Sequence, residues 1–154
     1  MKIMKFSPKY IDEMARLFAE AFSEPECEWD IPTAKAYLER DYKYYPDYCL
    51  MAINKDQEIM GAVFCAVDPY FRSRMLLVDS LQVKSQFRKQ GVAKALLREV
   101  FEKAKNEDFR GVHFLADETV DFPRGWYERL GFKKSCWTEY EADMSAINFE
   151  LLKE

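Results

Sequence analysis

The sequence has few of the residues that several common classes of function require. It contains one histidine, and its four cysteines include no Cys-x-x-Cys pair, which argues against a zinc site and predicts no bound metal. No apolar run approaches the roughly 20 residues of a membrane span. The opening residues 1–10 are too short and too polar for a signal peptide. Free thiols and no signal sequence together lead us to expect a cytosolic protein without a membrane partner.

Positively charged residues are also fewer than negatively charged ones. The chain has 23 Lys and Arg against 27 Asp and Glu, a net charge of −4. Nucleic-acid binding depends on clustered cations that neutralise phosphates, so we expect no nucleic-acid partner. A cationic small molecule suits the mildly acidic surface better. The length of 154 residues, 49% of them apolar, predicts a single domain over 1–154 with a packed core.

Hydrophobic periodicity predicts an α/β fold. Helical spacing covers residues 11–22 and a shorter stretch from 32, and a third helix covers 91–106 with one continuous apolar stripe. Helix and strand alternate between 75 and 130, which requires some parallel pairing, whereas 48–83 should form an antiparallel meander. We therefore expect a mixed sheet with helices on both faces. The predicted strands are 1–6, 48–54, 58–71, 75–83, 111–117, 132–141 and 147–153. A further helix is predicted over 122–130, with Gly131 at its C′ position.

One of only five glycines stands in the stretch RKQGVAKALL, residues 88–97. Gly91 follows two cations, Arg88 and Lys89, and opens the helix 91–106. Backbone N–H groups at a helix start, with cations beside them, are a common phosphate-binding arrangement. The alternative is an ordinary turn glycine. A plain helix cap would more often carry Ser, Thr or Asp, and none is present, which favours the phosphate site.

Two motifs resemble those of the GNAT superfamily of N-acetyltransferases. The segment VKSQFRKQGVAKALL (83–97) is similar to its coenzyme A loop, Arg/Gln-x-x-Gly-x-Gly/Ala, through Arg88, Gly91 and Ala93. The segment WYERLGF (126–132) is similar to the family's aromatic-Tyr-Glu-x-Leu-Gly-Phe. Each pattern is weak alone, but both stand in the expected context, and the element order matches over essentially the whole chain.

The resemblance implies acetyl-CoA as co-substrate. The turn from Arg88 through Lys89, Gln90, Gly91 and Val92 to Ala93 would then hold the pyrophosphate. In the family, strand 75–83 splays from strand 111–117 and the pantetheine arm inserts between them. Backbone groups near Leu81 and Val83 would pair with that arm as an added strand does. The alternative is that Leu81 and Val83 serve only the core.

The resemblance also implies catalytic residues. Tyr127 matches the family's general acid, which protonates the leaving thiolate. The base would stand at Leu77 or Asp79, and only the aspartate can act. Asp79 interrupts the apolar run MLLVDSL, and burial would raise its pKa toward that of a working base. The alternatives are a Tyr127 that only packs and an Asp79 paired with Arg72, Arg74 or a backbone N–H.

An acidic segment, SEPECEWD (23–30), lies between the first two helices and borders the acceptor site in the family. Its carboxylates and indole suit an amine, so Glu26, Glu28 and Trp29 are the substrate candidates, against the alternative of a solvated loop. We therefore predict an N-acetyltransferase for a small cationic primary amine, loosely like aminoglycoside-type members. A non-catalytic acyl-CoA-binding regulatory module, a protein or peptide acceptor, and a homodimer stay open.

Overall fold

The computed structural model describes residues 1–25, 27–116, 121–135, 142 and 144–147, with the backbone alone at 121–124. The chain divides into two compact units, Met1–Leu115 and Ala116–Glu154, and we describe each by itself. The single domain over 1–154 stays a prediction.

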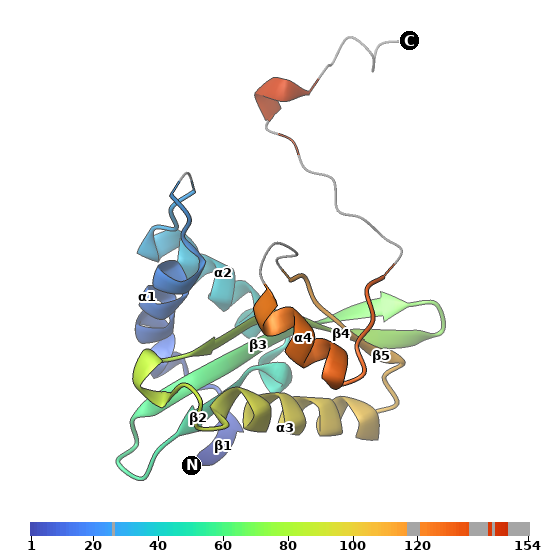
Figure 1. Cartoon of the computed structure of the whole chain (residues 1–154), viewed down its shortest axis with the longest axis horizontal. Helices are drawn as coiled ribbons and strands as arrows, with labels where there is room; N and C mark the ends of the chain where they lie inside the picture. The colour runs from blue at the N-terminus through green and yellow to red at the C-terminus, as the bar shows by residue number, and fades with distance from the viewer. Residues whose placement is uncertain (26, 117–120, 136–141, 143, 148–154) are drawn as a thin grey trace. The chain divides into compact units, whose positions relative to one another are not determined.

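The first unit is built on a five-stranded sheet in the order β1-β2-β3-β4-β5 (Figure 1). The first four strands, β1 (Lys2–Lys5), β2 (Leu50–Ile53), β3 (Ile59–Tyr70) and β4 (Ser73–Val83), pair antiparallel. Among the described strands, only β5 (Gly111–His113) is parallel to its neighbour, β4. This is the predicted mixed sheet with one parallel pair, although β5 ends four residues earlier than the predicted strand 111–117.

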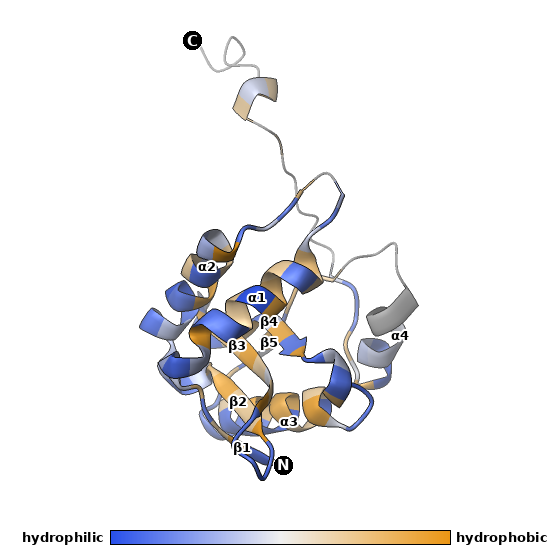
Figure 2. Cartoon of the chain, turned by 90° about the vertical axis from the view of Figure 1, so that its left-hand side faces the viewer, coloured by the Kyte–Doolittle hydropathy of each residue, from blue (hydrophilic) through white to orange (hydrophobic). Residues whose placement is uncertain are grey.

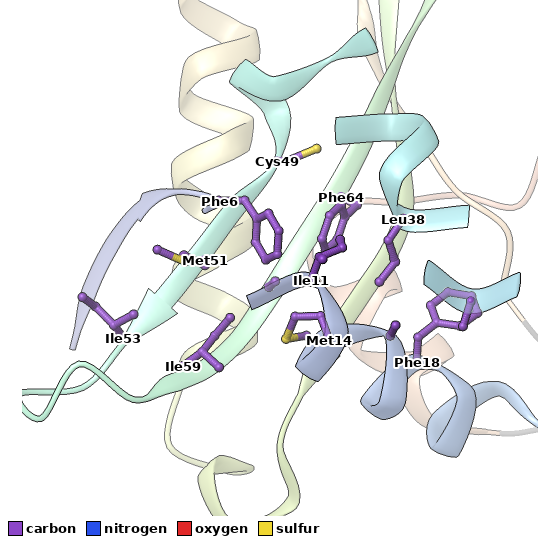
Figure 3. Packing of buried hydrophobic residues seen from close by; sticks show 13 residues of the cluster. Phe6, Ile11, Met14, Phe18, Leu38, Cys49, Met51, Ile53, Ile59 and Phe64 are labelled. Atoms are coloured by element: carbon purple, nitrogen blue, oxygen red, sulfur yellow. The ribbon is translucent and has the colours of Figure 1, made fainter. Parts of the chain in front are cut away.

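Helices α1 (Ile11–Phe22) and α2 (Ile31–Tyr44) cover one face of the sheet. Their apolar positions, among them Met14, Phe18 and Leu38, are buried against Met51 and Phe64 of the strands (Figure 3). The apolar side chains at helical spacing on α1 thus pack with the alternate side chains of β2 and β3 in one cluster. This packing removes apolar surface from water.

Helix α3 (Val92–Asn106) covers the opposite face (Figures 1 and 2). Its stripe Val92, Leu96, Leu97, Val100 and Ala104 is buried, as the 3.6-residue periodicity predicts. The connection from β4 through α3 to β5 is therefore a βαβ unit, and it fixes where the loop before α3 lies: at the carboxyl end of β4.

The described part of the second unit holds α4 (Asp121–Arg129) and a 3₁₀ turn, η4 (Met144–Ala146). Gly131 follows α4 with φ of 97°, as predicted for a C′ glycine. The Phe132 N–H donates to the Tyr127 carbonyl at 3.2 Å and the Gly131 N–H to the Glu128 carbonyl at 3.0 Å. These two bonds form a Schellman motif, which explains the glycine of WYERLGF.

The two predicted C-terminal strands lie mostly outside the described residues. Residues 132–135 of the predicted strand 132–141 are described. They follow the Schellman turn as irregular chain and do not form a strand. Of the predicted strand 147–153, only residue 147 is described, and it too lies outside any strand.

Candidate active site

The loop between β4 and α3 has a backbone that few residue types tolerate. It begins with a 3₁₀ turn, η3 (Ser85–Phe87), and then Lys89 and Gly91 adopt left-handed φ values of 60° and 80°. A Cβ added at Gly91 would meet nothing within 4 Å, so the space in front of the turn is open. Glycine is favoured at this position because of its left-handed φ and not because of crowding. This is the geometry expected where a backbone must come close to a ligand.

The electrostatics of this loop favour an anion. Its residues 88–91 are exposed, and the first turn of α3 contains no acidic residue. Gly91 is the N-cap and has no side chain to satisfy the first N–H groups of a 15-residue helix. The positive end of the helix dipole and the nearby cations Arg88 and Lys89 therefore act in the same direction.

The edge of β4 that faces β5 is paired along only part of its length. Met75, Leu76 and Leu77 pair with β5, and within the described ranges the rest of β4 has no strand on this side. The Arg88 Nε donates to the Val83 carbonyl at 3.2 Å, so this carbonyl points away from β3 and into the open edge. An extended ligand could pair there with the backbone of Leu81 and Val83.

A β-bulge lies in the middle of β4. Ser80 pairs with Phe64, whereas the next residue of β3, Cys65, pairs with Val78, so Asp79 is the extra residue. Directly paired residues share a face, which places Ser80 with Phe64 on the α1–α2 side. The Asp79 side chain also contacts α2. The bulge therefore directs the successive side chains of Asp79 and Ser80 to the same face of the sheet.

Asp79 is paired with Arg40 of α2. The Arg40 Nη2 lies 2.7 Å from the Asp79 Oδ2, and the Asp79 side chain is only 11% exposed. An ion-paired Asp79 was one of the sequence alternatives, but the partner is neither Arg72 nor Arg74. Arg74 instead donates to the Glu107 carbonyl at 2.8 Å.

The same guanidinium holds a second carboxylate. The Arg40 Nε donates to the Asp41 Oδ1 at 3.0 Å, and Asp41 is 1% exposed. Burial raises the pKa of Asp41 to about 6, and the nearby Asp79 carboxylate adds to that rise while Arg40 opposes it. Burial, together with a hydrogen bond to Asp79, also raises the pKa of Tyr37 to about 12.

The acidic segment is partly structural. The Asp30 Oδ1 accepts from the Thr33 N–H at 2.8 Å and caps α2, which lowers the pKa of Asp30. Trp29 packs edge-on against Phe18 and Tyr37, with ring centroids 4.8 and 5.3 Å apart. Glu24 and Glu28 are exposed, and Glu26 lies outside the described residues. The indole thus contributes to packing, whereas the Glu24 and Glu28 carboxylates face solvent.

Tyr127 lies on α4 in the second unit. Its ring packs near Trp126 and edge-on to Phe132, with centroids 5.0 and 6.0 Å apart. The Tyr127–Phe132 contact joins the C3 and C″ positions of the Schellman motif, where a hydrophobic contact is common. Burial raises the pKa of Tyr127 above its ordinary value near 10, so the phenol keeps its proton at neutral pH.

Comparison with known proteins identifies the family. The model of the acetyltransferase (GNAT) family matches residues 11–132, well over half of the chain. The chain belongs to the GNAT acetyltransferase family. The members of this family are acetyl-CoA-dependent N-acetyltransferases, which is the enzyme class predicted from the motifs of this chain.

Individual relatives are distant. Human N-acetyltransferase 8B is 30% identical over 89 residues, which is 56% of this chain and only 39% of that protein. A "possible acetyltransferase from Clostridium difficile 630" superposes with a TM-score of 0.79 at 13% identity, covering 93% of this chain and 97% of that one. The NatC complex bound to Gag peptide and CoA superposes with a TM-score of 0.68 at 19% identity, covering 88% of this chain and 87% of that one. The structural likenesses support the GNAT fold.

The residues present fit the co-substrate that GNAT enzymes use. The left-handed Gly91, the uncapped start of α3 and the open edge of β4 suit a ligand with a pyrophosphate and an extended amide-bearing arm. Among the described residues no group of three or more His, Cys, Asp and Glu could hold a metal, and His113 contacts Asp68 at 3.0 Å. No helix in the described ranges is long and apolar enough to span a membrane.

Sequence reasoning missed Arg40 and Asp41. A signal for Asp41 exists, because it continues the buried positions Ala34 and Leu38 at helical spacing. A carboxylate on the core-facing stripe of a helix is unusual and indicates a buried polar site. Nothing in the sequence indicates that Arg40 pairs with a residue 39 positions away.

Proposed function

We propose that this GNAT enzyme transfers the acetyl group of acetyl-CoA to a primary amine of a small cationic molecule by direct attack. The observation that carries the proposal is the open edge of β4, which leads directly into the left-handed Gly91 turn at the start of α3. Arg88–Ala93 would hold the pyrophosphate, and Leu81 and Val83 would pair with the pantetheine arm. The thioester supplies the acetyl group.

Two side chains move protons in this proposal. Asp79 accepts a proton from the acceptor's ammonium, and the freed electron pair on nitrogen forms the new C–N bond. The C–S bond breaks, and the Tyr127 hydroxyl gives its proton to the leaving thiolate. The acetylated nitrogen still carries one proton too many and releases it to solvent, which leaves the neutral amide. Solvent then restores the proton of Tyr127 and removes that of Asp79. The role of Asp79 is supported by its low exposure beside the open edge of β4, and that of Tyr127 by its place in WYERLGF.

A thiol-release assay with acetyl-CoA tests the proposed reaction. It would be run against polyamines, aminoglycosides, other small amines and peptide N-termini. We expect thiol release with small cationic amines. Release only with peptides would indicate a peptide acceptor. Acetyl-CoA binding without release from any acceptor would favour the non-catalytic module.

Replacing Gly91 by glutamate is expected to weaken acetyl-CoA binding about tenfold or more, equivalent to about 1.4 kcal/mol. The new carboxylate would face the pyrophosphate, and any side chain at φ of 80° adds strain. Gly91→Ala is the matched control because it adds the strain without the charge. Calorimetry should separate the two variants while their melting temperatures stay similar. Equal acetyl-CoA affinity of the glutamate variant and the wild type would show that the Gly91 turn does not bind the pyrophosphate.

Neutralising Glu26 and Glu28 to glutamine is expected to raise the KM for the acceptor and leave the KM for acetyl-CoA unchanged. Exposed carboxylates attract a cation at a range of about 10 Å in 0.1 M salt, so added salt should have the same selective effect. Glu99→Gln with Glu102→Gln on α3 changes the net charge equally and serves as the control in steady-state kinetics. An unchanged acceptor KM would make the segment an ordinary solvated loop.

A further inference from the structure

The site contains a cluster that the proposed reaction does not yet explain, formed by Tyr37, Arg40 and Asp41 of α2 with Asp79 of β4. Arg40 holds both carboxylates, with Nη2 at 2.7 Å from Asp79 and Nε at 3.0 Å from Asp41. It also lies over the Tyr37 ring, 4.4 Å from its centroid. Arg40 is half exposed, whereas Asp41 is buried beneath it.

The cluster has one negative charge more than it has positive charges when both carboxylates are ionised. The Asp41 Oδ2 is buried and, among the described residues, accepts no hydrogen bond. The buried Ser80 Oγ, on the same face of β4, is likewise without a partner within the described part of the chain. An uncompensated buried charge is expensive, so the pair of carboxylates should take up one proton readily.

The groups packed around the pair add no second positive charge. Tyr37 on α2 lies under the Arg40 guanidinium, and burial raises the pKa of its phenol to about 12, so it stays neutral. Cys49, just before β2, and Cys65 on β3 are buried thiols, and burial raises the pKa of both, so they stay neutral. Arg40 is therefore the group that opposes protonation, and the like charges of Asp41 and Asp79 favour it.

We propose that Asp41 and Arg40 are positioning residues for Asp79, and that the proton which Asp79 takes from the acceptor amine is held between the two carboxylates. The inference rests on the proposed function, because it assumes that Asp79 is the base. Asp41 is too buried to touch an acceptor and acts through Asp79. An N–H bond of the ammonium breaks, an O–H bond forms on the carboxylate pair, and the proton then leaves to solvent.

The pH profile of kcat/KM at saturating acetyl-CoA tests this proposal, because it reports the ionisations of the enzyme before the acceptor binds. The wild type should lose activity as the pH falls through about 6, the pKa of Asp41, because the site then already holds a proton before the acceptor binds. Asp41→Asn keeps the shape and the contact with Arg40 but removes one charge. It should shift the acid limb to lower pH by about one unit or more.

Arg40→Gln should shift the same limb in the opposite direction, to higher pH by about one unit, because it removes the cation that stabilises the ionised pair. Arg40 is 49% exposed, so glutamine in its place removes little packing, and a carboxylate left without its cation can be neutralised by a proton. Glu39→Gln is the matched control, since Glu39 is exposed on the same helix and its carboxylate lies 4.0 Å from Lys35. It should leave the limb in place.

A double-mutant cycle separates positioning from general structural damage. In an Asp79→Asn background, Asp41→Asn should cause no further loss of rate, because Asp41 acts through Asp79. If Asp79→Asn loses activity but neither Asp41→Asn nor Arg40→Gln moves the acid limb, this inference is wrong and the proposed base stands. If Asp79→Asn keeps full activity, the proposed base itself is wrong.

Discussion

Asp79→Asn is expected to lower kcat by roughly 10²–10⁴, the range for loss of a general base. Asparagine keeps the shape of the side chain at the bulge and its contact with Arg40, but it cannot take the acceptor's proton. The remaining Arg40 and Asp41 form a neutral pair, so the variant should melt close to the wild type. Steady-state kinetics with a reactive amine, beside calorimetry of acetyl-CoA, measure the two effects separately.

The expected pattern for Asp79→Asn is a large loss of kcat with nearly unchanged acetyl-CoA affinity. Asp68→Asn is a suitable control, because the Asp68 side chain on β3 is 46% exposed and, within the described chain, forms its ion pair with His113. If kcat for Asp79→Asn stayed within a few fold of the wild type, water or another group would be accepting the proton. The cluster of Tyr37, Arg40, Asp41 and Asp79 would then have a structural role.

Tyr127→Phe is expected to lower kcat by a similar factor, roughly 10²–10⁴, through loss of the proton donor to the thiolate. The ring contacts with Trp126 and Phe132 and the Schellman bonds of the backbone do not involve the hydroxyl. The packing of α4 should therefore survive the substitution, and acetyl-CoA affinity should change little. An equal fall in kcat and kcat/KM would place the lost interaction in the transition state.

Two further measurements make the Tyr127 prediction sharper. Because burial raises the pKa of Tyr127, its ionisation should produce no basic limb in the wild-type rate profile below about pH 10. Tyr44→Phe, at a tyrosine that is 64% exposed on α2, controls for loss of a hydroxyl elsewhere. Full activity of Tyr127→Phe would leave that tyrosine with a packing role and would require another proton donor.

The sequence by itself determined the features that depend on short spacing. Gly91 and Gly131 were predicted at a helix start and a helix end, and both adopt the left-handed φ that explains why glycine stands there. The apolar stripe of α3 and the antiparallel meander followed from periods of 3.6 and 2 residues. These rules act over one or two turns of chain, so the fold class and the glycine turn before α3 could be predicted.

Only the tertiary structure decided the environment of Asp79. The bulge depends on the register between β3 and β4, and a one-residue shift in register redirects side chains without leaving a mark in composition. The Arg40–Asp79 ion pair joins residues 39 positions apart, and the burial of Asp41 depends on how α2 packs on the sheet. Long-range packing sets solvation and neighbouring charge, and these set the proton affinity of a carboxylate.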